Sequence, residues 1–239
     1  MASKSLTLDN KTFDISYEII NPQAKKDIIF LHGWGSNKDI MKNVFAPFLK
    51  EFRHIYIDLP GFGKSLNEYE LKTEDYVKIT DEFLTLLNST KDVIVGHSYG
   101  GKVATSLNPK NLVLLSSAGI LEEKSFEVKA KIAIAKFFNA LGLKKVTKMF
   151  RSSDVNTMNE GMYATFKNVV NEDFTQGFKN YKNKALIFWG EKDTATSLES
   201  GKKIASLITS STFKSYDGDH YFFVKNAKDI AERIENGIL

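Results

Sequence analysis

The sequence predicts an α/β fold, with a mostly parallel central sheet, helices on both faces and a helical insertion. Short apolar runs recur along the chain, and most are separated by segments with helical spacing. Glycine-rich turns close several of these runs, as expected where a strand passes into a helix. The alternation stops over residues 121–180 and resumes after them. Alternating strands and helices favour a parallel sheet covered on both sides.

Length and composition narrow the possible classes. The 239 residues suit one large domain, or one domain with an insertion. The absence of cysteine excludes disulfides, thiolate catalysis and a cysteine-based zinc site. The net charge of +4 is too small to argue for nucleic acid. Residues 1–11 are polar, and no apolar run approaches the roughly 18 residues of a membrane span. We therefore expect a soluble, cytoplasmic protein with no nucleic-acid partner and no membrane span.

The first part of the chain is predicted to form four strands and two helices. The strands are the apolar runs Ser5–Leu8, Thr12–Ile19, Ile28–Leu31 and His54–Ile57. One helix is expected over Asp39–Leu49. A second is expected to begin with Thr73 as its capping residue and to run to about Leu87, because its apolar positions have helical spacing.

The second part predicts four more strands around the insertion. They are Asp92–Val95, Leu112–Leu115, Ala185–Trp189 and Thr212–Tyr216. Helices are expected from Tyr99 to about Ser106, where Asn108-Pro109 ends the helix, and over Ser197–Leu207 and Tyr221–Ile234. We assign residues 1–120 and 181–239 to the core. Residues 121–180, rich in Lys, Phe and Met, are assigned to a helical lid over the strand ends.

The most informative segment is Gly96-His97-Ser98-Tyr99-Gly100, which lies between a buried strand and a predicted helix. Gly-x-Ser-x-Gly in this context is a nucleophile elbow, a turn so tight that only glycine fits on either side of the serine. The helix that follows offers a backbone N–H and a positive dipole end where an oxyanion would form. Ser98 is therefore the candidate nucleophile. The alternative is a glycine-rich turn with a capping serine.

A serine nucleophile needs a base, and the chain has only four histidines. His97 adjoins Ser98 and should point away from it, while His32 and His54 lie at the ends of early strands. His220 follows a late strand within Asp217-Gly218-Asp219-His220 and is the candidate base. It could instead be an ordinary loop histidine.

The acid that orients the base should lie at a strand end between Ser98 and His220. Asp193 fits, because Trp189-Gly190-Glu191-Lys192-Asp193 follows a predicted strand. Glu191 is the nearest rival and Asp173 a more distant one. The candidates therefore follow one another along the chain in the order serine, acid, histidine. Catalytic triads on different folds have different chain orders, and this order is characteristic of one fold.

A tetrahedral intermediate also needs two N–H donors. The turn His32-Gly33-Trp34-Gly35 offers the backbone N–H of Trp34, and the elbow offers that of Tyr99. Trp34 could alternatively fill the core, although the flanking glycines favour an exposed turn.

Together these segments resemble the α/β-hydrolases. The resemblance covers nearly the whole chain and includes His32–Gly35, Gly96–Gly101, Trp189–Asp193, Asp219-His220 and the segment Asp58-Leu59-Pro60-Gly61-Phe62-Gly63-Lys64-Ser65. It implies a helical cap between strands six and seven and no cofactor. It also implies Ser98 as nucleophile, His220 as base, Asp193 as orienter, and Trp34 and Tyr99 as oxyanion donors. The chain departs from the family in having Asp219 where glycine is common, and in a short helix after the elbow. No cluster has metal-ligand spacing, and a P-loop fails because position 58 is Asp.

A serine at the elbow favours acyl transfer to water, so the expected substrate is a small-molecule carboxylic ester. C–C bond hydrolases of the 2-hydroxy-6-oxo-dienoate type often carry Asn before the serine and Trp after the histidine. Here His97 and Tyr221 occupy those places, which weighs against that group. A non-catalytic ligand-binding homologue is a further alternative, against which an intact triad argues.

The pairing of His32–Gly35 with Asp58–Ser65 resembles the esterases that demethylate pimeloyl-carrier-protein methyl ester, whose partner is acidic. Residues 121–152 hold eight basic and three acidic residues and could steer such a carrier protein. A solvated lid face is the preferred interpretation of these charges. Five lid residues are candidates either for an apolar acyl pocket or for the lid's own core: Phe137, Phe138, Met158, Met162 and Phe166.

Overall fold

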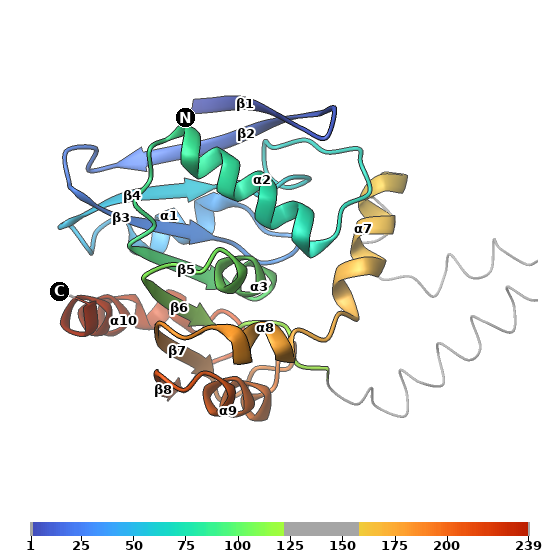
Figure 1. The fold of residues 1–239 in the computed structure, drawn as a ribbon. Helices are drawn as coiled ribbons and strands as arrows, with labels where there is room; N and C mark the ends of the chain where they lie inside the picture. Colours follow the sequence, from blue (N-terminus) through green and yellow to red (C-terminus); the bar gives the residue numbers. More distant parts are fainter. Residues whose placement is uncertain (1, 122–157, 239) are drawn as a thin grey trace, which may run out of the picture.

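The computed structural model describes residues 2–121 and 158–238, and these form a layered structure around one eight-stranded sheet (Figure 1). The strand order is β1-β2-β4-β3-β5-β6-β7-β8. β1 pairs antiparallel with β2, and β2 with β4, whereas every other neighbouring pair is parallel. The strands are β1 Ala2–Leu8, β2 Lys11–Ile20, β3 Lys26–Leu31, β4 Phe52–Ile57, β5 Val93–His97, β6 Asn111–Leu115, β7 Lys184–Gly190 and β8 Ser211–Tyr216.

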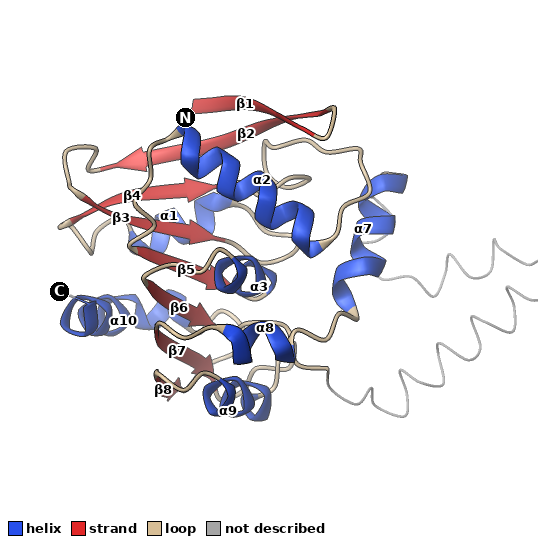
Figure 2. Ribbon diagram, in the orientation of Figure 1, coloured by secondary structure: helices blue, strands red, loops and turns tan. Residues whose placement is uncertain are grey.

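Helices cover both faces of the sheet (Figure 2). One face carries α1 and α10, which contact each other, and the opposite face carries α2, α3, α8 and α9. The helices are α1 Lys38–Phe45, α2 Thr73–Leu86, α3 Tyr99–Ser106, α7 Glu160–Val170, α8 Thr175–Asn180, α9 Leu198–Leu207 and α10 Phe223–Ile238. The structure confirms the predicted α/β class.

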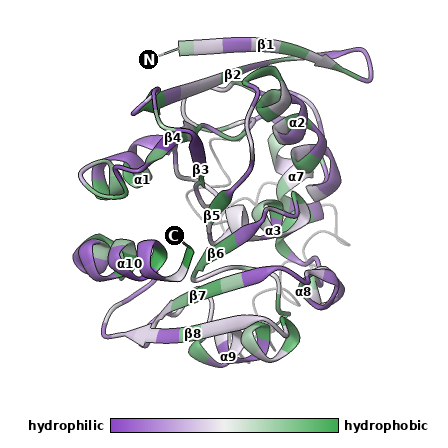
Figure 3. Ribbon diagram, turned by 60° about the vertical axis from the view of Figure 1, so that its left-hand side comes forward, coloured by the Kyte–Doolittle hydropathy of each residue, from purple (hydrophilic) through white to green (hydrophobic). Residues whose placement is uncertain are grey.

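Two hydrophobic cores form because successive side chains of a strand point to opposite faces. Along β3, Ile29 and Leu31 pack toward α2 and α3, whereas Ile28 and Phe30 pack toward α1 and α10. The central strands β5 and β6 are coloured largely hydrophobic in Figure 3, whereas the outer helices show mixed faces. Central strands buried on both sides are typical of a parallel sheet. Residues at their carboxyl ends are therefore held by packing from two directions.

All eight predicted strands are present, with ends that differ by a few residues. β5 continues through Gly96 to His97, so the strand ends directly at Ser98. α1 ends at Phe45 rather than Leu49, because Pro47 cannot donate the backbone hydrogen bond that would continue it. The prediction that Thr73 is the capping residue of α2 was wrong.

Lys72 occupies the capping position of α2, and its N–H donates to Asp75 Oδ2 at 2.8 Å. The Thr73 hydroxyl donates instead to Glu172 Oε2, between α7 and α8. Contacts with a distant segment thus replaced the local cap that the sequence suggested.

The described part of the insertion, with α7 and α8, lies between β6 and β7. The division into a core and a lid over 121–180 stays a prediction. Phe137, Phe138 and the basic residues of 121–152 lie outside the described residues. Among the residues that are described, no helix combines the length and apolar character needed to cross a bilayer.

Candidate active site

Ser98 lies at the turn between β5 and α3, in a backbone conformation that residues other than glycine rarely adopt. Its φ is +51° and its ψ is −118°. Its N–H donates to Leu115 O at 3.1 Å, and its carbonyl accepts from Gly101 N at 3.0 Å. A Cβ at Gly100 would lie 2.4 Å from Leu31 O, so this position requires glycine. Strain held in place by surrounding structure is characteristic of functional sites.

The turn after β3 lies directly against Ser98. A Cβ at Gly33 would lie 2.9 Å from Ser98 Cβ, which shows how closely the two loops approach. Within the described chain, neither the Trp34 nor the Tyr99 backbone N–H donates a hydrogen bond. The first N–H groups of a helix have no intrahelical partner, which explains the free donor at Tyr99. Both candidate oxyanion donors are thus available beside the elbow.

The Trp34 side chain packs against other aromatic rings, as expected from the alternative interpretation that Trp34 fills the core. Its ring lies 4.8 Å from that of Phe62, 5.7 Å from Tyr99 and 5.5 Å from Phe166, centroid to centroid. Side chain and backbone therefore have separate roles: the ring anchors the turn, and the N–H stays free.

His32 ties the loop after β3 to the loop after β4. Its Nδ1 donates to Gly33 O at 2.8 Å, and its Nε2 accepts from Leu59 N at 3.0 Å. Burial lowers the pKa of His32 to about 4, so the ring is neutral at neutral pH. A neutral ring fits these contacts, because one nitrogen must donate while the other accepts. His32 fixes backbone beside the elbow and is not placed to act as a base.

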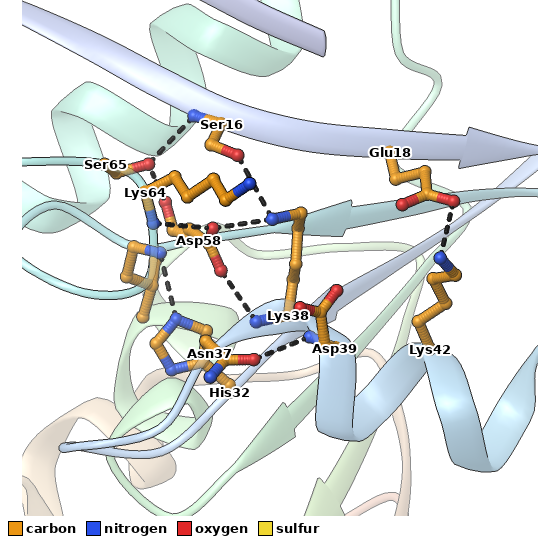
Figure 4. A network of polar contacts seen from close by, with 11 residues as sticks. Ser16, Glu18, His32, Asn37, Lys38, Asp39, Lys42, Asp58, Lys64 and Ser65 are labelled. Carbon is orange, nitrogen blue, oxygen red and sulfur yellow. Dashed lines mark hydrogen bonds and ion pairs between the residues drawn. The ribbon is translucent and has the colours of Figure 1, made fainter. Parts of the chain in front are cut away.

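Asp58 is the centre of a buried polar network (Figure 4). Its carboxylate accepts from Lys38 Nζ at 2.7 Å, Lys38 N at 2.8 Å and Lys64 N at 3.0 Å. Its backbone oxygen accepts from Ser65 Oγ at 2.7 Å, which accepts in turn from Ser16 N. Burial alone would raise the pKa of Asp58, but the hydrogen bonds from Lys38 and Lys64 keep it below its usual value. The network joins the start of α1 to the loop after β4.

Lys38→Met should destabilise the protein by about 3–5 kcal/mol, because the Asp58 carboxylate would remain buried without its cation. Both side chains of the pair are only 1% exposed. The matched control is Lys42→Met one turn along α1, whose partner Glu18 and own side chain are 24% and 30% exposed. That change should cost less than about 1 kcal/mol. Denaturant unfolding of both variants measures the difference, and equal losses would refute a structural role for the buried pair.

His220 and Asp193 are hydrogen-bonded to each other, with His220 Nδ1 2.7 Å from Asp193 Oδ2. The other carboxylate oxygen, Oδ1, accepts from the backbone N–H groups of Ala195 at 2.8 Å and Thr196 at 3.0 Å. Burial would raise the pKa of Asp193, but the hydrogen bonds from His220 and Thr196 lower it to about 2. Asp193 is therefore ionised at neutral pH and fixes His220 with its proton on Nδ1.

The rival carboxylates are engaged elsewhere. Glu191 accepts from Ser215 Oγ at 2.7 Å, and Asp173 accepts from Thr175 N at 2.9 Å. Asp219, the departure from the family pattern, accepts from Tyr221 N at 2.8 Å and so shapes the turn that carries His220.

His97 connects the His220 loop to the elbow. Its Nε2 lies 3.0 Å from His220 O, and the two ring centroids are 4.6 Å apart. In the chain as described, no hydrogen bond joins Ser98 Oγ to His220. Catalytic hydrogen bonds commonly tighten only when substrate is bound. The hydrogen bond between His97 and the His220 carbonyl links the residue beside Ser98 to the loop that carries His220.

A cavity of about 290 Å³ opens at Ser98. Its wall includes Trp34, Tyr99, Phe166, Lys102 and Glu172. A second cavity, of about 590 Å³, also has Trp34 in its wall and is lined in part by Met158, Met162 and Tyr221. Phe166 thus borders the Ser98 cavity, whereas Met158 and Met162 border the second one. Met162 is also only 5% exposed and packs in the main hydrophobic core, and its role in binding an acyl group stays a prediction.

Sequence reasoning missed Lys102 and Glu172. Lys102 is 2% exposed and donates to Glu172 Oε2 at 2.7 Å and Val169 O at 2.8 Å. Desolvation lowers the pKa of Lys102, although the hydrogen bond with Glu172 opposes that shift. The position of Lys102, four residues after Ser98 on the same helical face, was the available signal. The ion pair joins α3 to the segment between α7 and α8 and gives the Ser98 cavity a polar wall.

Within residues 2–121 and 158–238, no group of three or more His, Asp or Glu side chains is arranged to hold a metal ion. Residues 28–232 match the family model of the Alpha/beta hydrolase family. The chain belongs to this family. A pimeloyl-[acyl-carrier protein] methyl ester esterase from Wigglesworthia glossinidia brevipalpis is 31% identical over 143 residues, covering 50% of this chain and 54% of the relative. The chain therefore spans about half the length of that relative.

Solved structures of other proteins share the fold. An esterase from Exiguobacterium antarcticum superposes with a TM-score of 0.74 at 20% identity, over 95% of this chain and 96% of the other. An enol-lactonase from Burkholderia xenovorans LB400 superposes with a TM-score of 0.76 at 17% identity, over 98% of each chain. At such identities the likeness concerns the fold alone.

Proposed function

We propose that this α/β-hydrolase is a serine carboxylic-ester hydrolase. Ser98 Oγ attacks the ester carbonyl while His220 Nε2 takes its proton, and the oxyanion is bound by the backbone N–H groups of Trp34 and Tyr99. His220 then gives the proton to the leaving alcohol. A water molecule, deprotonated by His220, releases the acid and restores Ser98. Asp193 stabilises the imidazolium and holds its tautomer throughout.

One observation supports the proposal above others. The strained Ser98 borders a cavity, and a histidine already paired with a buried carboxylate is tied to the residue beside it. An ordinary loop histidine has no need of a buried, ionised partner whose pKa lies near 2. Ionisable groups whose pKa values are strongly shifted cluster at catalytic sites.

The volume of the Ser98 cavity favours short acyl groups. At about 290 Å³ it lies just below the range of roughly 300–1,000 Å³ for ligand sites. In a panel of p-nitrophenyl esters from acetate to laurate, kcat/KM should therefore peak among the short chains and fall toward laurate. A C–C diketone substrate measured beside the panel tests the rival chemistry. Turnover of the diketone without ester turnover would favour the C–C bond hydrolases, and turnover of neither would favour a ligand-binding homologue.

An ester on an acidic carrier protein is a second candidate substrate. The observation that favours it is that the Wigglesworthia relative, which shares 31% identity, is named as an esterase of a carrier-protein methyl ester. Carrier-bound methyl pimelate should then be hydrolysed with a higher kcat/KM than the free methyl ester, by a factor that falls as salt is added. Equal rates for both forms would leave a small-molecule ester as the substrate.

A further inference from the structure

His97, next to Ser98 in the sequence, contacts the candidate base His220. Its ring is buried among three aromatic side chains of the loop before α10 and its first turn. The centroid distances are 4.6 Å to His220, 5.1 Å to Tyr221 and 4.9 Å to Phe223. The only hydrogen bond of the ring within the described residues runs from Nε2 to the His220 carbonyl, at 3.0 Å.

The partner of Nε2 decides the tautomer of His97. A carbonyl oxygen can only accept, so Nε2 must carry the proton. Nδ1 has no hydrogen-bond partner and lies close to Gly33, since a Cβ there would be 3.1 Å from it. Protonating Nδ1 would bury an unpaired N–H and a charge, which is costly. The ring is therefore a neutral donor with its proton on Nε2, the opposite tautomer to that of His220.

We propose that His97 is a positioning residue that fixes the backbone of His220 beside Ser98. This inference rests on the proposed function, because it concerns the residue proposed as base. His220 lies on the loop between β8 and α10, with a side chain 16% exposed, while its Asp193 partner is fully buried. The carboxylate holds one ring nitrogen, and the donor on His97 holds the main chain. Two fixed points prevent the loop from carrying the imidazole away from the elbow.

Neutrality suits this role. Burial lowers the pKa of His97 to about 3, with the nearby His220 charge acting in the same direction. When His220 accepts a proton during the reaction, a neutral neighbour does not repel the imidazolium. A second charge at 4.6 Å would oppose its formation.

Two substitutions separate donation from packing. His97→Phe keeps an aromatic ring but removes the donor. His97→Gln can place its amide N–H near the position of Nε2. We expect the Phe variant to lower kcat for the best ester by about 10–100-fold with KM changed less than about twofold, because small misplacement of a base acts on the chemical step. The Gln variant should recover most of the loss. Circular dichroism and thermal unfolding verify that both variants fold.

A spectroscopic readout makes the test independent of turnover. With only four histidines, ¹⁵N-histidine NMR can assign each ring. The wild-type spectrum should show His97 protonated on Nε2 and His220 on Nδ1. In the Phe variant, the Nδ1–H signal of His220 should exchange with solvent at least about tenfold faster, and the Gln variant should restore its protection.

The outcomes distinguish the inference from the function on which it rests. An inactive wild type with the expected spectra would overturn the ester hydrolysis but keep His97 as the residue that fixes His220. An active wild type whose Phe variant matches it in kcat and in the His220 signal would overturn the inference alone. So would a His97 ring that carries its proton on Nδ1.

Discussion

Replacing Ser98 by Ala is expected to lower kcat/KM for the best ester by on the order of 10⁴-fold or more. Alanine keeps the Cβ and the backbone of the elbow, so the cavity and the His220–Asp193 pair should persist. What disappears is the oxygen that would form the acyl-enzyme. Steady-state hydrolysis of the short p-nitrophenyl esters, with enzyme concentration raised to detect residual turnover, measures the effect.

The matched control is Ser106→Ala, at the exposed end of the same helix. It should leave kcat/KM within about twofold of wild type. If Ser98→Ala retained more than a hundredth of the activity while unfolding at the wild-type temperature, Ser98 would not be the nucleophile.

Asp193→Asn should reduce kcat by on the order of 10²–10⁴-fold, with little change in folding. The reason lies in the two backbone N–H groups of Ala195 and Thr196, which donate to Oδ1. In the variant they require the amide oxygen at that position, so the amide NH₂ faces His220. Nδ1 would then have to accept, and the proton would move to Nε2, where it blocks proton removal from Ser98.

Glu191→Gln is the control for this change. Glu191 lies two residues away on the same loop, and its carboxylate accepts from Ser215 rather than from His220. Its replacement should alter kcat by less than about twofold. A larger loss in Glu191→Gln than in Asp193→Asn would exchange the roles of the two acids.

Sequence alone predicted those features that local sterics and periodicity decide. The short helix α3 was predicted to run from Tyr99 to about Ser106, because Asn108-Pro109 stops it, and it spans Tyr99–Ser106. Asp193 was selected for its place after a strand and a glycine turn, with Glu191 as the nearest rival, and its hydrogen bond with His220 is the contact that separates the two. Glycine at position 100 was predicted as a steric necessity, and the close approach of Leu31 O confirms it.

Contacts between distant segments could not be predicted in this way. The hydroxyl of Thr73 was expected to cap its own helix but bonds to Glu172, which is far along the chain. The pairing of Lys38 with Asp58 depends on how α1 sits on the sheet, although Asp58 belonged to a segment already singled out. His97 was expected only to point away from Ser98. The hydrogen bond from its ring to the His220 carbonyl depends on how α10 packs on the sheet, and no local sequence pattern specifies that packing.

The most direct test of the central claim is covalent labelling with a fluorophosphonate, followed by mass spectrometry of the labelled peptide. The account predicts one phosphonylated residue, Ser98, in the wild type and no labelling in Ser98→Ala. A wild-type protein that hydrolyses esters but carries the label on another residue, or on none, would contradict it.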